Sequence, residues 1–304
     1  MKIVRFNGEL LNKTLNEILN VAEMRGIQWN RFKELNKLLK GFRSREMTVL
    51  SGKTGVGKTT FACEYSLDLA EQGVRTLWGS FEMPLPRICR TLLHQYAGET
   101  LHSQPPIRVA AWATAFQQEL PMLFLNMHGR PSEKEVFDAL DESVKQEGVE
   151  HVILDNLQFM MGCGGTGGRS GMEEKFTRQD RFVERLRAFS TDSGAHLTLV
   201  VHPRKVDDDH LLSIASLYGG GKISQEADNI MLVQEEIGTA VPKRYLQVRH
   251  VTYFKSVGKF NYKIVKNRYD GTLGKMDLNY NRSRMSFRPS TRTLEDISSS
   301  EAVD

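Results

Sequence analysis

Short apolar runs alternate with longer amphipathic stretches along most of this chain. Six runs have the length and composition of buried strands: residues 47–50, 76–81, 151–154, 196–201, 229–233 and 244–248. Apolar residues at helical spacing separate several of these runs, at 58–72, 84–98, 132–147 and 174–193. Strands that alternate with helices usually pair in parallel, with the helices on the faces of the sheet. The pattern therefore predicts an α/β fold with a mostly parallel central sheet flanked by helices.

The N-terminal part of the chain has a different pattern. Between residues 8 and 40, apolar residues recur three and four positions apart in two stretches, and Gly41 ends the pattern as a C-cap glycine would. We predict a short helical linker over residues 1–40 and a main domain over residues 41–288. Two interpretations of the linker are open: a cap on the domain's own core, or an oligomerisation arm that docks on a neighbouring subunit. The polar, Ser-rich tail at 289–304 is predicted to be disordered.

A phosphate-binding loop follows the first predicted strand. Residues 52–59 match G-x-x-x-x-G-K-[ST], with a strand entering the loop and a helix leaving it. Glycines let backbone N–H groups approach a triphosphate, and the helix N-terminus favours the same anion. Lys58 can reach the β- and γ-phosphates, and the Thr59 hydroxyl can hold Mg²⁺. The cofactors predicted are ATP or another NTP, with Mg²⁺. The predicted nucleotide-binding residues of this loop are Gly52, Lys53, Thr54, Gly55, Val56, Gly57, Lys58, Thr59 and Thr60.

Three further polar residues stand directly after predicted strands. Asp155 follows residues 151–154, where a second acidic ligand of the Mg²⁺ shell is expected. Glu82 follows residues 76–81 and is a candidate for the base that activates water, or else a surface glutamate before Met83. His202 is either a γ-phosphate sensor or a strand-end histidine with satisfied hydrogen bonds.

Composition narrows the class of protein. The net charge of +4 permits a nucleic-acid partner without requiring one, and 40% hydrophobic residues are ordinary for a globular domain. The three cysteines, Cys63, Cys89 and Cys163, have no C-x-x-C spacing. This excludes a disulfide framework and a cysteine-based zinc site, and it fits a reducing compartment. No apolar run approaches the ~20 residues of a transmembrane helix, so no membrane insertion is expected.

Taken together, several stretches resemble the ring-shaped replicative DNA helicases of superfamily 4, the family of bacterial DnaB, the phage primase–helicases and the mitochondrial replicative helicase. The resemblance spans roughly residues 30–288. The stretches that carry it are residues 77–82, 152–161, 201–205, 224–229 and 243–248.

The resemblance implies a RecA-like P-loop NTPase core in a hexameric or heptameric ring of identical chains around single-stranded DNA. It implies NTP hydrolysis at subunit interfaces and 5′-to-3′ unwinding of forked DNA. By resemblance alone, the partners are the mitochondrial replication machinery and the location is the mitochondrial matrix or nucleoid. No transit peptide is visible in the sequence.

Residue roles follow from the same resemblance. Lys58 and Thr59 match the Walker A pair, Asp155 the Walker B acid, Glu82 the catalytic glutamate and His202 the γ-phosphate sensor. These matches favour the functional interpretations of Glu82 and His202 over the structural ones.

Further roles concern the subunit interface and DNA. Arg268 matches an arginine finger that reaches a neighbour's γ-phosphate, Lys266 is placed to assist it, and Tyr280 matches an aromatic residue stacked on the base. DNA contacts are expected from the Gly-rich loop at 162–171 and from the loop that begins at Arg204. The DNA-binding residues implied are Arg204, Lys205, Gly219 and Gln225.

The chain departs from the family pattern in two ways. About 16 extra residues at 249–264 separate the last matching strand from Arg268. The segment is basic and aromatic. It is a hairpin extension, an added nucleic-acid contact or an artefact of the gene model, and it can impair delivery of Arg268. Met1 begins at the linker, so a primase-like domain is not expected.

Two other functions stay open from the sequence. One is a RecA-type DNA-dependent ATPase that catalyses strand exchange. The other is a catalytically impaired isoform that binds nucleotide as a scaffold subunit.

Overall fold

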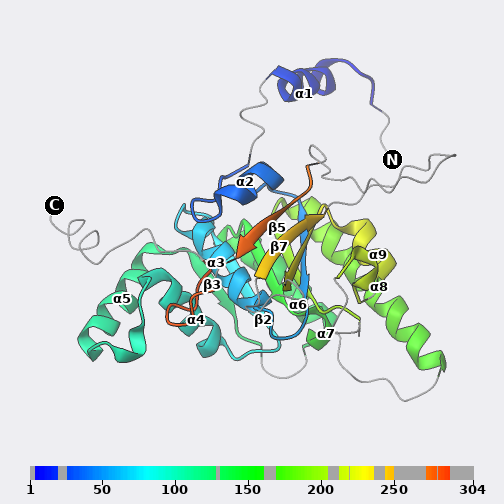
Figure 1. The fold of residues 1–304 in the computed structure, drawn as a ribbon. Coiled ribbons are helices and arrows are strands. Elements are labelled where there is room, and N and C mark those ends of the chain that lie inside the picture. The colour runs from blue at the N-terminus through cyan, green and yellow to red at the C-terminus, as the bar shows by residue number, and fades with distance from the viewer. Residues whose placement is uncertain are drawn as a thin grey trace.

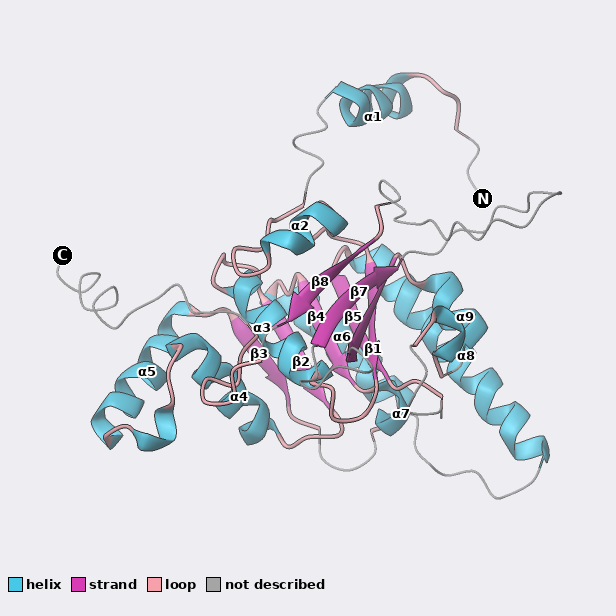
Figure 2. Ribbon diagram, in the orientation of Figure 1, coloured by secondary structure: helices cyan, strands magenta, loops and turns pink. Residues whose placement is uncertain are grey.

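An eight-stranded sheet forms the centre of the protein in a computed structural model (Figures 1 and 2). The structure describes residues 4–19, 26–127, 131–160, 169–204, 212–218, 220–235, 244–249, 272–278 and 280–287. The strands are β1 (Met47–Gly52), β2 (Thr76–Ser80), β3 (Met122–Leu125), β4 (His151–Asp155), β5 (His196–Val201), β6 (Asn229–Glu235), β7 (Arg244–Arg249) and β8 (Gly274–Leu278). The α-helices are α1 (Gly8–Leu19), α2 (Lys33–Leu39), α3 (Lys58–Ala70), α4 (Leu85–Ala97), α5 (Pro106–Glu119), α6 (Glu133–Glu147), α7 (Leu157–Met160), α8 (Arg169–Ser193) and α9 (Gly220–Glu226). Two 3-10 turns are η1 (Leu101–Ser103) and η2 (Ile214–Ser216).

The strands lie in the order β3-β2-β4-β5-β1-β6-β7-β8. The first six strands in this order, from β3 to β6, run parallel, whereas β7 and β8 pair antiparallel at one side. The predicted mostly parallel α/β fold is therefore confirmed.

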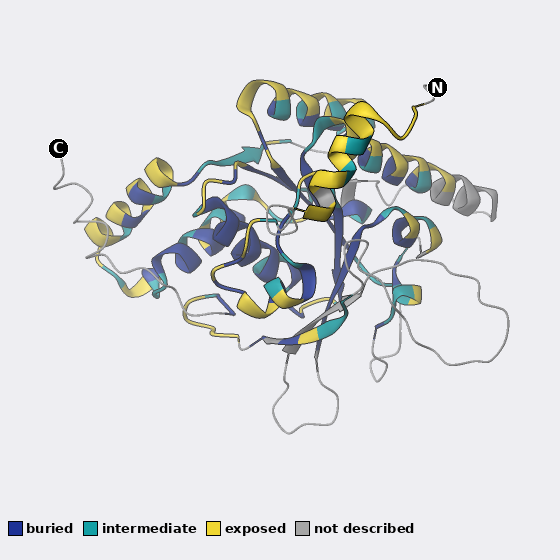
Figure 3. Cartoon of the chain, turned by 90° about the horizontal axis from the view of Figure 1, so that it is seen from above, coloured by how far each residue is buried: buried dark blue, intermediate teal, exposed yellow. Residues whose placement is uncertain are grey.

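Successive strand residues are buried on opposite faces of this sheet. Trp78 and Ile153 belong to one hydrophobic cluster, together with residues of α2, α3, α4 and α5. The neighbouring Leu77 and Val152 belong to a second cluster with α6, α8 and α9. Side chains alternate across a strand, so near-continuous apolar runs fill two cores at once. Figure 3 shows the buried strands between helices whose outer faces are exposed.

Local signals define where several helices begin. Ser132 caps α6 in a capping box: its hydroxyl accepts the N–H of Glu135, whose carboxylate accepts the N–H of Ser132. Prolines stand at the start of α4 (Pro84 and Pro86) and of α5 (Pro105 and Pro106), and they suit the first helical turn because the N–H groups there have no partner within the helix.

The structure adds elements that the hydrophobic pattern did not predict. These are the helices α5, α7 and α9, the four-residue strand β3, and β8, which lies beyond the unusual segment at 249–264. The helical pattern over residues 8–40 corresponds to two separate helices. Residues 169–171 of the Gly-rich segment expected to be a loop belong to α8.

The two N-terminal helices differ in burial. Leu35 and Leu39 of α2 are buried in the domain core, beside Trp29 and Phe32. In contrast, α1 lies apart from the sheet, and its Ile18 and Leu19 are 64% and 76% exposed (Figure 1). The second half of the expected linker thus packs as part of the main domain.

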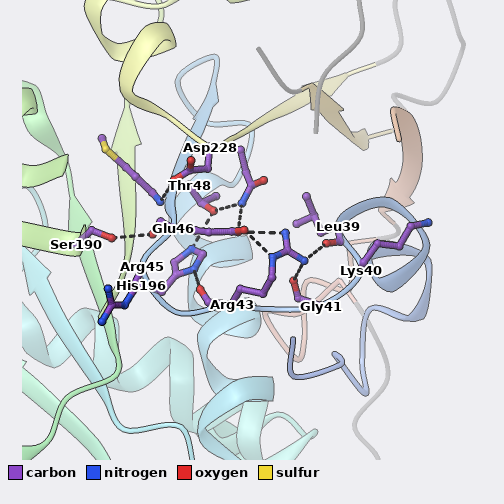
Figure 4. Close-up of polar contacts among 12 residues, drawn as sticks. Leu39, Lys40, Gly41, Arg43, Arg45, Glu46, Thr48, Ser190, His196 and Asp228 are labelled. Atoms are coloured by element: carbon purple, nitrogen blue, oxygen red, sulfur yellow. Dashed lines mark hydrogen bonds and ion pairs between the residues drawn. The ribbon is translucent and has the colours of Figure 1, made fainter. Parts of the chain in front are cut away.

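Buried polar residues tie together the amino-terminal edge of the sheet (Figure 4). His196 Nδ1 lies 2.6 Å from the Arg43 carbonyl oxygen, and its Nε2 lies 2.9 Å from Thr48 Oγ1. Asp228 accepts the backbone N–H of Met47 at 2.8 Å. These contacts join β5, β1 and the segment after α2, at the end of the sheet away from the phosphate-binding loop.

No helix among the described residues combines the length and apolar character needed to cross a bilayer.

Candidate active site

The predicted chemical groups meet at the carboxyl-terminal edge of the parallel strands. Gly52 ends β1, Asp155 ends β4, and Glu82 and His202 follow the ends of β2 and β5. Because β2, β4, β5 and β1 are consecutive neighbours in the sheet, their carboxyl ends lie side by side. This edge is where ligands bind in open α/β sheets.

The phosphate-binding loop is shaped by its glycines. Gly55 and Gly57 have φ values of +79° and +98°, a region that favours glycine. A Cβ on Gly52 would lie 2.6 Å from the Val233 carbonyl oxygen, so β6 approaches too closely for a side chain at this position. Gly57 is the N-cap of α3, and the amino end of the helix faces the loop. The loop thus has the strand–loop–helix form that the motif requires.

Lys58 is folded back into this loop. Its ammonium donates hydrogen bonds to the carbonyl oxygens of Gly52 at 2.9 Å and Lys53 at 3.1 Å. Burial lowers the pKa of Lys58, while the negative charges of Asp155 and Glu82 act in the opposite direction. A buried cation that is held by neutral carbonyl groups would be better stabilised by the oxygens of a phosphate.

Thr59 and Asp155 form the candidate metal site. The Thr59 hydroxyl donates to Asp155 Oδ2 at 2.6 Å. Burial raises the pKa of the Asp155 carboxyl, and the nearby Glu82 carboxylate adds to that shift, although the Thr59 hydrogen bond and the charge of Lys58 oppose it. A buried carboxylate beside a second carboxylate is a fitting place for a cation.

The donor set fits Mg²⁺ in particular. Mg²⁺ is commonly held by one or two protein oxygens, with phosphate oxygens and water completing the shell. Among the described residues, no group of three or more His, Cys, Asp or Glu side chains could hold a metal ion. When bound, Mg²⁺ would neutralise charge on the phosphates.

Glu82 and His202 are joined by a residue that the sequence analysis did not single out. Asn156 Nδ2 donates to Glu82 Oε2 and lies 2.9 Å from His202 Nε2. The carboxylate and the imidazole are 3.3 Å apart. Asn156 follows Asp155 directly, through a cis peptide bond. The rule that located Glu82 and His202, a polar residue just beyond a strand, also applies to Asn156.

The segment after β5 is anchored next to this group. Gln158 Oε1 accepts the backbone N–H of His202 at 3.1 Å. Arg204 is exposed, and its backbone N–H donates to Ser216 of η2 at 2.7 Å. Gln225 lies exposed on α9, a helix that contacts η2. Two of the expected DNA-binding residues therefore flank the same turn.

An aromatic pair lies beside the phosphate-binding loop. Tyr280 is 36% exposed, and its ring centroid is 5.2 Å from that of Phe287. Phe287 in turn approaches Gly57, where an added Cβ would lie 3.0 Å from the phenyl ring. The backbone N–H of Phe287 donates to the buried carboxylate of Glu64 on α3. Tyr280 thus packs on Phe287, which in turn lies against the loop at Gly57. This position is consistent with stacking of the tyrosine ring on a nucleotide base.

Four predicted site residues lie outside the described residues: Lys205, Gly219, Lys266 and Arg268. The same holds for the segment at 250–264, for the tail and for most of the Gly-rich loop.

This fold and this arrangement define a P-loop nucleoside triphosphatase with a RecA-like core. A family model described as an AAA domain matches residues 13–208, more than half of the chain, and the chain belongs to that family.

Solved structures share the fold at low sequence identity. One solved ATPase domain has a TM-score of 0.71 at 14% identity, over 93% of this chain and 100% of that one. A DnaB-like replicative helicase, described with its interactions with primase, has a TM-score of 0.67 at 15% identity, over 94% of this chain and 67% of that one. A KaiC-like protein from the hyperthermophilic archaeon Pyrococcus horikoshii OT3 has a TM-score of 0.56 at 14% identity, over 88% and 97%. The similarity to these three is one of fold.

Proposed function

We propose that this chain is the NTP-hydrolysing motor domain of a ring-shaped replicative DNA helicase of the DnaB-like class. The observation that carries the proposal is the juxtaposition of a candidate base and a candidate sensor, Glu82 and His202, beside Lys58 and the Thr59–Asp155 pair. Phosphoryl transfer to water needs a positioned water, a metal ion and charge neutralisation, and these residues can supply each need.

The residues divide the chemistry between them. Lys58 exchanges its loop carbonyls for the β- and γ-phosphate oxygens of the substrate, while Thr59 and Asp155 would hold Mg²⁺. Glu82 accepts a proton from the attacking water as the water's oxygen bonds to the γ-phosphorus, and the nucleoside diphosphate leaves. His202 contacts the γ-phosphate and changes its contacts when this group departs.

The proposal includes a subunit interface and a DNA channel. Arg268, assisted by Lys266, would reach the γ-phosphate bound to the adjacent protomer of a hexameric or heptameric ring. Arg204, Lys205, Gly219 and Gln225 would face single-stranded DNA. A few cations per subunit suffice, because a ring repeats each of them six or seven times; this reconciles a net charge of +4 with a DNA partner. Contacts to phosphates carry no sequence information, so binding would be independent of sequence.

Within this class, the sequence stretches that carry the resemblance point to Twinkle, the mitochondrial replicative DNA helicase. We therefore extend the proposal to 5′-to-3′ unwinding in the mitochondrial nucleoid, with the replication machinery as partner. The support for this step is the sequence resemblance.

ATP hydrolysis and fork unwinding test the proposed function. We expect ATPase activity that single-stranded DNA stimulates, and unwinding of a fork that has a 5′ tail on the tracking strand. Lys58→Ala should lower turnover by at least about 10²-fold, because the phosphates lose their main charge partner. Lys145→Ala, at an exposed site on α6, is the matched control and should keep wild-type rates. Retained turnover in Lys58→Ala would contradict the site assignment.

Deleting residues 249–264 tests the impaired-isoform alternative. DNA-stimulated hydrolysis by both the full chain and the deletion variant supports the helicase. Activity that appears only after deletion supports an isoform in which the segment blocks Arg268. Nucleotide binding without turnover in either form would support a scaffold role, and strand exchange without unwinding would support a RecA-type enzyme.

A further inference from the structure

Asn156 occupies the centre of the Glu82–His202 group and is fully buried. It lies at the end of β4, the strand between β2 and β5. Glu82 follows the end of β2 and His202 follows the end of β5. One amide group on the middle strand therefore contacts the functional side chains of both neighbouring strands.

The amide has the right chemistry to hold both groups. An Asn NH₂ carries two N–H donors: here Nδ2 donates to the Glu82 carboxylate and lies 2.9 Å from the imidazole Nε2 of His202. In the tautomer with the ring proton on Nδ1, Nε2 keeps a free lone pair and accepts the second N–H of Asn156. In this arrangement the ring does not donate to Glu82, and the carboxylate keeps lone pairs for a water.

A second amide secures the backbone of His202. Gln158 Oε1 accepts the N–H of His202 at 3.1 Å, and Gln158 Nε2 donates to the carbonyl oxygen of the same residue at 3.4 Å. That carbonyl also accepts the N–H of Tyr218 at 3.3 Å. Both the ring and the peptide of His202 are thus tied to the turn that follows β4.

We infer that Asn156 is a positioning residue, supported by Gln158, that sets the Glu82 carboxylate and the His202 imidazole relative to each other for hydrolysis. The inference rests on the proposed function, since Glu82 must be the base for its position to matter. Asn156 acts through Glu82 and does not itself bind nucleotide: the nucleotide is held by Lys58 and Thr59.

Asn156→Ala should therefore affect kcat and KM differently. A displacement of a catalytic group by about 1 Å can cost ~10²-fold in rate, so kcat should fall by about that factor. KM for ATP and the affinity for a non-hydrolysable analogue should stay within about two-fold, because loss of an interaction made in the transition state leaves ground-state binding intact. A higher kcat would mean that the amide restrains the base, and it would overturn the inference.

A double-mutant cycle separates positioning from a structural role. If Asn156 acts through Glu82, Asn156→Ala should cost about 10²-fold in the wild-type background but less than about three-fold in a Glu82→Ala background. A role in folding alone predicts the same loss in both. Single-turnover hydrolysis gives the rates, and a Tm for each variant shows that the folded protein is being compared.

Asn36 offers a matched control. Its side chain accepts the N–H of Trp29 and donates to the carbonyl oxygen of Trp29, both at 2.8 Å, far from the site. Asn36→Ala removes a comparable amide clamp and should leave kcat per folded molecule unchanged. Should the wild type show no turnover that depends on Lys58, the proposed function fails. Should turnover depend on Lys58 but not on Asn156, or should the cycle be additive, the inference alone fails.

Discussion

At the scale of single residues, the conformation of Gly57 is constrained both by its own loop and by a residue that is distant in the sequence. Gly57 takes a φ of +98° to begin α3, and Phe287, from the far end of the chain, packs against it. The left-handed conformation follows from the loop motif, but the contact with Phe287 arises only in the folded protein. Gly57 therefore links the shape of the phosphate-binding loop to the position of the aromatic pair Tyr280 and Phe287.

Gly57→Ala should damage both stability and nucleotide binding. The residue would adopt a strained backbone conformation, at a cost of about 1–2 kcal/mol, and its Cβ would press on the Phe287 ring. We expect a lower Tm in thermal unfolding and a several-fold weaker affinity for a nucleotide analogue in a titration.

Gly73→Ala provides the comparison, since Gly73 has a φ of +88° and nothing within 4 Å of an added Cβ. That variant should lose stability through strain alone and bind nucleotide as the wild type does. Equal nucleotide affinity in both variants would contradict a role for Gly57 in the site.

At the scale of elements, α3 and α4 hold the segment 280–287 beside the nucleotide site. Gln95 on α4 donates to the carbonyl oxygen of Met285 at 2.8 Å and to that of Thr60 at 3.0 Å. Glu64 on α3 accepts the N–H of Phe287 at 2.6 Å. Two helices that flank the loop thus also determine where Tyr280 lies.

Gln95→Met should weaken nucleotide binding with little loss of stability. The change keeps the side-chain length but removes both donations, and net hydrogen bonds of about 0.5–1.5 kcal/mol correspond to a KM for ATP raised roughly two- to ten-fold. The Tm should fall only slightly, because the loss of the two donations is partly offset by removal of the buried side-chain oxygen of Gln95, which has no hydrogen-bond partner among the described residues. Steady-state kinetics and thermal unfolding check the two parts.

Gln104→Met is the control variant: it removes a side-chain amide that donates to the Glu99 carboxylate, and it should leave the KM for ATP unchanged. An unchanged KM in Gln95→Met as well would mean that the segment 280–287 does not contribute to nucleotide binding.

At the scale of the whole molecule, the two edges of the sheet hold different kinds of polar residues. The carboxyl edge holds the candidate site, while the amino edge holds the buried imidazoles His151 and His196. Burial lowers the pKa of both, to about 4 for His196 and well below the usual value for His151. These residues stabilise the fold as neutral groups.

Acid should therefore destabilise the protein through these histidines. Unfolding exposes imidazoles that titrate near pH 6.5, so the unfolded state binds protons that the folded state does not. The stability they contribute is complete above pH 6.5 and declines as the pH falls towards 4, by roughly 1.4 kcal/mol per pH unit for each histidine. Denaturant unfolding at a series of pH values measures this slope.

His196→Asn is the test variant, because an amide can still donate to the Arg43 carbonyl oxygen. It should be less stable at pH 7.5, yet lose less stability than the wild type between pH 7 and pH 5. An identical slope would exclude His196 as a source of the acid sensitivity.

The proposed assembly into a ring gives a prediction at the same scale. Arg268→Ala should bind nucleotide without hydrolysing it, since in the proposed function this arginine acts on a neighbour's site. Mixing it with Glu82→Ala should restore part of the ATPase activity, because some interfaces then combine an intact base with an intact finger. Hydrolysis by the mixture that equals the sum of the separate variants would argue against a shared site.

Sequence and structure contributed differently to this picture. The alternation of apolar runs was sufficient for the class of fold, because a strand that is buried on both faces is apolar over most of its length, as β4 and β5 are. It did not predict β3, which has only four residues, or α5, whose Trp112 and Ala115 are buried while much of its surface is exposed. Short elements carry too few residues for periodicity to be distinctive.

The sequence by itself determined the chemistry of the phosphate-binding loop, because residues 52–59 are contiguous and their spacing alone sets the backbone that cradles a phosphate. It also placed Asp155, Glu82 and His202 at strand ends. The tertiary structure decided that these ends are neighbours, that Asn156 bridges Glu82 and His202, and that Phe287 returns to Gly57. The reason is physical: strand order and long-range contacts depend on how both cores fill together, and no local pattern of residues encodes that packing.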